Sequence, residues 1–152
     1  MKNSLSIFVF SLLALVFAAT LEEFAPKPVG VGFPILLSAA QHVAARRPLL
    51  TSLIFAVAAG AIEDALSALP MVTSASFFLA AVAAVKGSGH PRALMAFTYP
   101  LYQVWLWLWV SDLGGGVFMR FVVALPLGVV TVVAVACLLE FLERRAGVDV
   151  AA

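Results

Sequence analysis

Six long apolar runs, separated by short breaks that contain Pro, Gly or charged residues, constrain this chain more than any other feature. They cover residues 5–21, 29–45, 49–69, 71–85, 93–110 and 117–139. Inside hydrocarbon, backbone polar groups must be satisfied within a helix or a closed barrel. Barrel strands are about 10 residues of alternating polarity, whereas these runs are longer and apolar on all sides. The sequence therefore predicts an all-α fold: a polytopic transmembrane helical bundle of about six spans, forming one integral membrane domain over residues 1–152.

Composition agrees with this prediction and excludes several functional classes. Hydrophobic residues make up 64% and charged residues 11% of the 152 residues, whereas soluble proteins carry about 25% charged residues. The net charge of +1 provides no basic stripe for nucleic acid. Cys137 is the single cysteine, and His42 and His90 lack the spacing of metal ligands. We therefore expect no metal, no cofactor, no catalytic residue and no nucleic-acid partner, and we do not expect an enzyme.

The Lys and Arg residues fall mostly on one side of the predicted bundle. If the N-terminus is cytoplasmic, the cytoplasmic positions are Lys2, Arg46, Arg47, Lys86, Arg92, Arg144 and Arg145, and the opposite side holds Lys27 and Arg120. Because cytoplasmic loops are enriched in Lys and Arg, we predict an N-in/C-in, multi-pass protein of the bacterial inner (cytoplasmic) membrane. The apolar run after Met1-Lys2 also fits a cleaved signal peptide, and the sequence leaves that alternative open.

The third apolar run carries a stripe of small and polar residues. Ala56, Gly60 and Asp64 are spaced four apart, and Ser67 continues the stripe. Small residues at this spacing allow a neighbouring helix to approach closely, and a carboxylate near the membrane needs hydrogen-bond donors or a cation. We interpret the stripe as a helix-packing or partner-binding surface, with Arg120 as the candidate ion-pair partner of Asp64. The alternative is that the acids simply reach water at the outer interface.

The third and fourth runs are separated only by Pro70. Proline ends or kinks a helix. The two runs therefore form either a tight helical hairpin or one broken helix, and the sequence is compatible with both.

An aromatic cluster lies in the second half of the fifth run. Tyr102, Trp105 and Trp109 share one helical face because they are spaced three and four residues apart. They are expected to form either a belt at the outer membrane interface or a partner-binding surface.

Several short motifs between residues 30 and 145 match the pattern of a known family. They are Phe33-Pro34, Ala44-Ala-Arg46-Arg47-Pro48, Gly60-Ala-Ile-Glu-Asp64, Ser67-Ala-Leu-Pro70 and Leu142-Glu-Arg144-Arg145. This pattern resembles the MreD family of rod shape-determining membrane proteins. In that family a Pro opens the second span, an Arg-Arg step ends it, and the third span ends in Gly-x-x-x-Asp before a Pro-containing turn. After this Pro the family tends to have Gly and Asn, where this chain has Val72 and Ser74.

The resemblance implies a non-catalytic membrane subunit of the cell-elongation (rod) complex. Such a subunit helps to position peptidoglycan synthesis and to maintain cell shape. Its expected partners are an MreC-like bitopic protein and, through it, MreB and the peptidoglycan synthases.

Two transport functions are the alternatives. A substrate-binding membrane subunit of a vitamin-type (energy-coupling factor) transporter also has about six spans and needs a polar, aromatic-lined pocket near the outer face. The residues that would build such a pocket are Glu63, Asp64, Tyr102, Trp105 and Arg120. A proton-coupled small transporter would need a carboxylate deeper in the membrane than Asp64.

Overall fold

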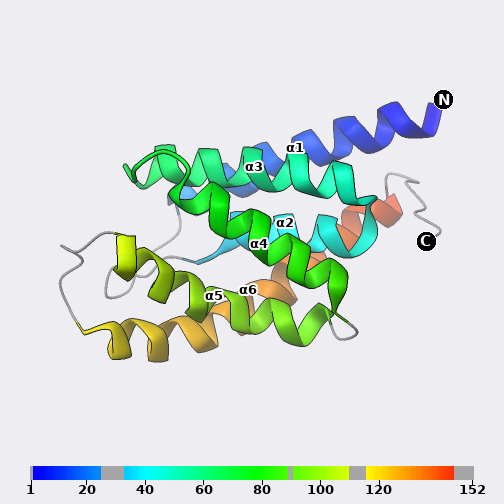
Figure 1. The fold of residues 1–152 in the computed structure, drawn as a ribbon. Helices are drawn as coiled ribbons and strands as arrows, with labels where there is room; N and C mark the ends of the chain where they lie inside the picture. Colours follow the sequence, from blue (N-terminus) through cyan, green and yellow to red (C-terminus); the bar gives the residue numbers. More distant parts are fainter. Residues whose placement is uncertain (1, 25–32, 89–90, 110–115, 146–152) are drawn as a thin grey trace.

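The computed structural model describes residues 2–24, 33–88, 91–109 and 116–145. All regular structure in these residues is α-helical, so the all-α prediction is confirmed for this part of the chain. The helices, drawn in Figure 1, are α1 (Lys2–Phe24), α2 (Ile35–Arg46), α3 (Leu49–Leu66), α4 (Thr73–Gly87), α5 (Pro91–Trp109) and α6 (Val117–Arg145).

Fewer helices meet the length and composition of a membrane span than the apolar runs predict. Among the described residues, α3 and α6 are long and apolar enough, with mean hydropathies of 1.7 and 2.8. Helix α2 has 12 residues and α4 has 15, whereas a span needs about 20. Helix α2 is shorter than the predicted run 29–45 because it begins only after Pro34, and Arg47, before Pro48, is already extended. Residues 29–32 of that run lie outside the described residues.

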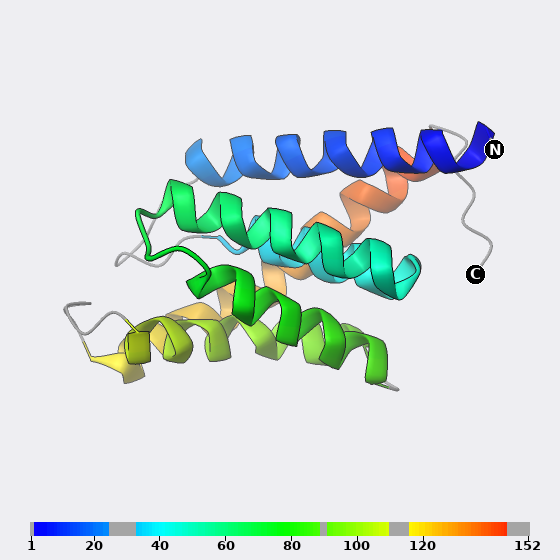
Figure 2. The same cartoon turned by 45° about the horizontal axis from the view of Figure 1, so that its top comes forward.

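Helix α2 is the central helix of the bundle. All nine residues from Leu36 to Ala44 are buried, and α2 packs against each of the other helices. A helix surrounded on every side has to be apolar or to have its polar groups satisfied. The side-chain amide of Gln41 on α2 donates a hydrogen bond to the hydroxyl of Thr98 on α5. Figure 2 shows how α6 begins beside α5 and crosses the bundle toward the start of α1.

The third and fourth runs form a tight helical hairpin. Helices α3 and α4 lie side by side in opposite directions (Figures 1 and 2), so the alternative of one broken helix is wrong. The turn between them contains two non-glycine residues with positive φ, Ala68 at 50° and Val72 at 77°. A positive φ is unfavourable for residues with a side chain, especially for β-branched Val. The turn is therefore held in place by contacts on either side of it.

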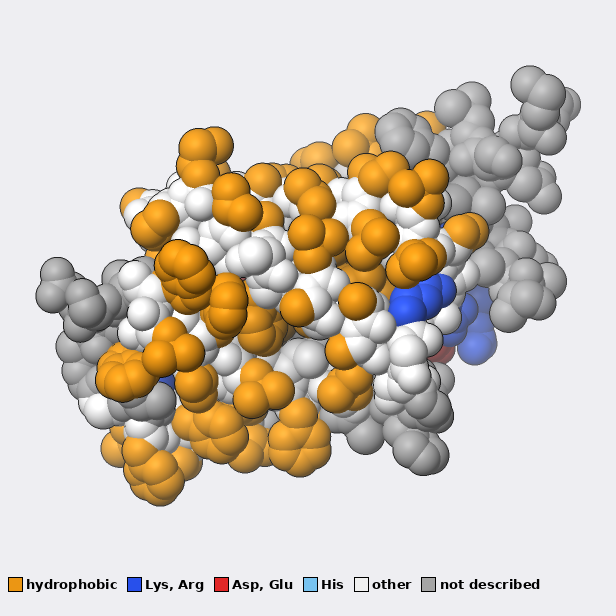
Figure 3. All heavy atoms as spheres, viewed as in Figure 1, with side chains coloured by type: hydrophobic (Ala, Val, Ile, Leu, Met, Phe, Trp, Pro, Cys, Tyr) orange, Lys and Arg blue, Asp and Glu red, His pale blue; other side chains and the backbone are white. Residues whose placement is uncertain are grey.

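Charged groups gather at the two ends of the bundle, and hydrophobic side chains cover the surface between them. Helix directions alternate (Figure 1), which brings Arg46, Arg47, Lys86, Arg144 and Arg145 to one end, here called the basic end. The other end, with Glu22, Glu23, Glu63 and Asp64, is the acidic end. Figure 3 shows hydrophobic side chains over most of the visible face, with Lys and Arg at the basic end. Leu13, Leu50 and Val130 are each more than half exposed.

Candidate functional site

The closest approach between helices in the stripe occurs at Gly60. A Cβ atom added to Gly60 would lie 2.6 Å from the backbone nitrogen of Ala75 and 2.9 Å from the carbonyl carbon of Ser74. Backbone atoms cannot move aside as a flexible side chain can, so α4 can pack here only against glycine. Ala56, one turn earlier, is completely buried. The structure thus places Gly60 in a backbone contact between α3 and α4.

Asp64 lies one turn after Gly60 and binds the start of α4. Its Oδ1 accepts a hydrogen bond of 2.7 Å from the backbone N–H of Ser74, in the first turn of α4. The first N–H groups of a helix have no partner inside the helix, and a carboxylate is favoured there by the helix dipole. Asp64 is only 4% exposed. It therefore acts as an N-terminal cap for α4 across the hairpin.

Two of the predicted stripe residues have other positions and partners. The predicted ion pair between Asp64 and Arg120 is not formed, because Asp64 is hydrogen-bonded to Ser74 and its Oδ2 is buried with no hydrogen-bond partner among the described residues. The group that donates to Asp64 is a backbone N–H, and the residue spacing in the sequence could not predict it. Ser67 is exposed, follows the end of α3, and donates to Glu63 Oε1 at 2.9 Å. The stripe that faces α4 therefore ends at Asp64.

The aromatic residues of α5 divide between the interior and the surface. Tyr102 is 3% exposed, its hydroxyl is hydrogen-bonded to that of Ser74, and its ring contacts Phe78. Trp105 is half-buried and donates from its indole nitrogen to the carbonyl of Thr73 at 3.0 Å. Trp109 is 60% exposed. Of the three predicted aromatic residues, only Trp109 has the exposure that a membrane belt requires; Tyr102 and Trp105 fix α5 to the start of α4.

A cavity of about 360 Å³ opens at the acidic end, and every helix contributes to its lining. The charged residues that line it are Glu22, Glu23, Glu63 and Arg120, and the polar and aromatic ones include Phe78, Tyr99, Tyr102 and Gln103. Its volume lies within the range of small-molecule sites, roughly 300–1,000 Å³. Of the residues predicted for a transporter pocket, the structure brings Glu63, Tyr102 and Arg120 to this cavity. Asp64 and Trp105 are not among its lining residues.

Glu22 is positioned by the start of α2, just as Asp64 is positioned by the start of α4. Its Oε2 accepts a hydrogen bond of 2.6 Å from the backbone N–H of Leu36, which lies in the first turn of α2. The hydrogen bond holds the end of α1 against α2 at the rim of the cavity. Two acidic side chains at this end of the bundle therefore accept hydrogen bonds from helix N-termini: Glu22 from α2 and Asp64 from α4.

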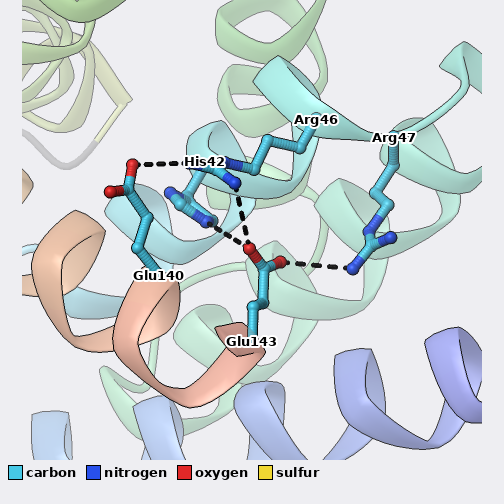
Figure 4. A network of polar contacts seen from close by, with 5 residues as sticks. All are labelled: His42, Arg46, Arg47, Glu140 and Glu143. Atoms are coloured by element: carbon cyan, nitrogen blue, oxygen red, sulfur yellow. Dashed lines mark hydrogen bonds and ion pairs between the residues drawn. The ribbon is translucent and has the colours of Figure 1, made fainter. Parts of the chain in front are cut away.

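At the basic end, five side chains form a compact ion-pair network, here called the basic-end network (Figure 4). Arg46 reaches Glu140 at 2.6 Å and Glu143 at 3.2 Å, and Arg47 reaches Glu143 at 3.2 Å. His42 Nε2 lies 3.8 Å from Glu143. Arg47 and Glu143 are 3% and 5% exposed. The network joins the end of α2 to the end of α6 with two guanidinium groups facing two carboxylates.

The sequence did not predict this network. Glu140 and Glu143 share one helical face because they are three residues apart. This spacing indicates that the two carboxylates point in the same direction. Their partners, however, lie more than 90 residues earlier in the chain, and no local pattern shows which distant helix faces them.

Among the described residues, no group of three or more His, Cys, Asp or Glu side chains is placed to hold a metal ion. Comparisons of the chain with protein-family models, with curated proteins and with solved structures found no match.

Proposed function

We propose that this chain is a non-catalytic, six-span inner-membrane subunit of the bacterial cell-elongation (rod) complex, of the type that the MreD family represents. In this role it binds an MreC-like bitopic protein and, through it, MreB and the peptidoglycan synthases. It contributes to cell shape by positioning peptidoglycan synthesis rather than by carrying out a reaction.

The observation that carries the proposal is the fit between the family pattern and the α3–α4 hairpin. Position 72, where the family tends to have Gly, has a φ of 77° in this chain, the region that glycine tolerates best. The Gly and Asp of the Gly-x-x-x-Asp motif also have distinct physical tasks here. Gly60 admits the backbone of α4, and Asp64 caps it. Because both residues act on the start of α4, the motif is specific to this hairpin and is not a general feature of apolar helices.

The distribution of polar and apolar surface supports six spans rather than two. Large exposed hydrophobic side chains occur on α1, α3, α5 and α6, and contiguous apolar surface of this extent is typical of a membrane or partner interface. Helix α2 is enclosed by the other helices, and α4 packs mainly against α2, α3 and α5. We propose that both short helices cross the bilayer within a bundle whose longer helices provide most of the contact with lipid.

Reporter fusions test the membrane topology. Fusions after Arg47, Arg92 and Arg145 should report the cytoplasm, and fusions after Lys27 and Gly115 the periplasm. A periplasmic result at Arg92 would contradict the six-span topology, because it would mean that α3 and α4 do not both cross the membrane.

Co-purification tests the proposed partner. The tagged full-length chain, solubilised gently from its native membranes, should recover a bitopic MreC-like protein. Gly60→Leu should abolish this recovery, because Leu cannot fit against the backbone of Ala75. Ala61→Leu is the matched control, since the neighbouring Ala61 is exposed, and it should retain the partner. Absence of the bitopic protein from the wild-type sample would refute the proposal.

A second candidate function is favoured by the cavity at the acidic end: a substrate-binding membrane subunit of a vitamin-type transporter. Its support is the combination of a ligand-sized volume with Glu63, Tyr102 and Arg120 in the lining. A vitamin bound in one-to-one ratio in native mass spectrometry, together with co-purifying ATPase subunits, would place this function ahead of the first.

A further inference from the structure

We propose that a groove between α2, α5 and α6 binds one anionic phospholipid, with an acyl chain along the groove and the phosphate at the basic end. The lipid belongs to the leaflet at the basic end, which is the cytoplasmic leaflet in the proposed topology. The inference goes beyond the proposed function and rests only on the membrane location that this function includes.

The groove is open to the outer surface of the bundle and is apolar over most of its length. Its volume is about 660 Å³, within the range of roughly 300–1,000 Å³ that is typical of ligand sites. Met95 and Val132, which are buried, line its inner part, whereas Val133 and Cys137 line it and are exposed. An elongated apolar molecule can therefore enter the groove sideways from the surrounding hydrocarbon.

The length of the groove matches one leaflet of a bilayer. Its lining on α6 runs from Val129 to Glu140, about 16 Å along the helix axis. The hydrocarbon core of a bilayer is about 30 Å thick, so a single leaflet is about half of that. The groove ends where α5 and α6 meet, because a Cβ atom added to Gly128 would lie 3.1 Å from the carbonyl oxygen of Ala96. A partner helix that spans the membrane would need a longer groove, whereas one acyl chain fits this length.

Arg46 lies at the basic end of the groove and keeps donors for a phosphate. His42, Arg46 and Glu140, gathered in Figure 4, are the polar part of the lining. A guanidinium has five N–H groups, and Arg46 uses one on each terminal nitrogen for Glu143 and Glu140. Its side chain is 35% exposed. Because arginine binds phosphate through several N–H groups, Arg46 can bind a phosphate oxygen without releasing its carboxylates.

Arg144 extends the polar end of the groove by one helical turn. Val133, Cys137, Glu140 and Arg144 follow one another at spacings of four, three and four, so they share one face of α6. Arg144 is exposed, and among the described residues it forms no ion pair with a carboxylate. Its guanidinium is therefore a second group available to the phosphate.

The charge at this end selects an anionic headgroup over a zwitterionic one. Within the basic-end network, two arginines are balanced by two glutamates. Lys86, Arg144 and Arg145 lie at the same end, and in the part of the chain that the structure describes none of them pairs with a carboxylate. This positive charge attracts a phosphate but repels the ammonium group of a zwitterionic headgroup. Basic pockets between membrane helices on the cytoplasmic side typically bind anionic headgroups.

The test measures lipid binding to the full-length protein in micelles of a non-ionic detergent. The probes are dimyristoyl phosphatidylglycerol, dimyristoyl phosphatidylcholine and inorganic phosphate, so the two lipids differ only in their headgroups. Native mass spectrometry counts the bound lipid. Alkylation of Cys137, the single cysteine of the chain and a residue of the groove lining, reports whether the groove is filled.

Phosphatidylglycerol should bind in a one-to-one ratio and slow the alkylation of Cys137 in proportion to the fraction bound. Phosphatidylcholine should bind about tenfold more weakly or worse, because its ammonium group meets the positive end of the groove. Inorganic phosphate should leave alkylation unchanged, because it has no chain to place in the groove.

A matched pair of arginine variants tests the headgroup site. Arg144→Gln should weaken the binding of phosphatidylglycerol about tenfold, since it removes a charged donor to the phosphate. Arg145→Gln removes the same charge, but Arg145 is turned about 100° around the helix, and its guanidinium lies 4.9 Å from the ring centre of Phe141. This control should change the affinity by about twofold at most. Both arginines are exposed, so neither variant is expected to impair folding.

A second matched pair tests the groove. Ala136 is half-buried and lines the groove, and Ala134 is exposed on the same helix and is not among the lining residues. Ala136→Phe fills the space for the chain and should abolish the one-to-one binding of phosphatidylglycerol in native mass spectra. Ala134→Phe should retain it.

Four results would overturn the inference. These are no saturable binding of phosphatidylglycerol, equal affinity for the two lipids, equal effects of the two arginine variants, and loss of a co-purifying protein rather than of lipid in Ala136→Phe. The last result would identify a partner helix as the occupant. The proposed function is tested separately by Gly60→Leu, which acts on the contact between α3 and α4, so the two proposals can fail independently.

Discussion

The two ends of the bundle hold their charges in different ways. At the basic end, Arg46 and Arg47 form direct ion pairs with Glu140 and Glu143 from α6. At the acidic end, carboxylates outnumber cations in the described lining, and two of the acids bind backbone N–H groups at the starts of helices. The comparison shows that the same residue types can close one end of a bundle and leave a cavity at the other.

Helix dipoles explain why charges of each sign gather where they do. Helices α2, α4 and α6 end at the basic end, where cations complement the partial negative charge of C-termini. Lys86 of α4 donates to the carbonyl of Arg47 there. The same three helices begin at the acidic end, where carboxylates are favoured. The gathering of Lys and Arg at one end of the bundle thus agrees with the directions of the helix dipoles.

The largest expected effect comes from removing the acid at the centre of the basic-end network. Glu143→Leu leaves the buried guanidinium of Arg47 without its carboxylate, and it should lower the free energy of unfolding by about 3–5 kcal/mol. The double variant Arg47→Met/Glu143→Leu should recover part of this loss, because no unpaired charge remains. Denaturant titration in mixed micelles measures both. A double variant less stable than Glu143→Leu would show that the pair is not the source of the stability.

The next effect concerns the cap at the acidic end. Asp64→Leu removes the acceptor for the N–H of Ser74 and should cost about 1–2 kcal/mol. Asp64→Asn keeps an oxygen at the same place and removes a poorly compensated charge, so we expect it to be tolerated. The measurement is the unfolding free energy of each variant. Equal destabilisation by Leu and Asn would mean that the charge of Asp64, rather than its hydrogen bond, is what α4 requires.

The sequence predicted the helices and their packing contact better than it predicted the polar partners. Helix content follows from apolar runs that need internal hydrogen bonds, and the contact at Gly60 follows from the four-residue spacing of Ala56, Gly60 and Asp64. The partner of Asp64 could not be predicted, because the donor is a backbone group whose position depends on the turn between α3 and α4. The same limit applies to Glu143, whose cationic partners lie on a helix distant in sequence.

The boundaries of the helices show a second limit. Apolar composition predicted a span over 29–45, but the helix begins only at Ile35, because Pro34 limits where helix geometry can start. Tyr102 shows a third limit. Its spacing with Trp105 and Trp109 indicated a shared face, but the distance of each side chain from the bundle axis depends on the crossing of α4 and α5.

The smallest effect tests the turn that joins the two capped helices. Val72 has a φ of 77°, and Val72→Gly should raise the unfolding free energy by up to about 1 kcal/mol, since glycine tolerates this conformation. Met71→Gly is the matched control. Met71 is 90% exposed and is not among the residues with positive φ, so glycine there should be neutral or destabilising. A loss of stability in Val72→Gly would contradict the assignment of strain to position 72.

The most direct test of the difference between the two ends is the same chemical change made at each. Glu143→Gln and Glu63→Gln both convert a buried glutamate to its amide with little change in size, and their unfolding free energies are to be measured in the same mixed micelles. We predict that Glu143→Gln is destabilising by several kcal/mol, because it removes a charge that two guanidinium groups require. Glu63→Gln should cost little stability, because an amide oxygen can still accept the hydrogen bond that Ser67 donates to this side chain. Equal destabilisation by the two variants would contradict the account.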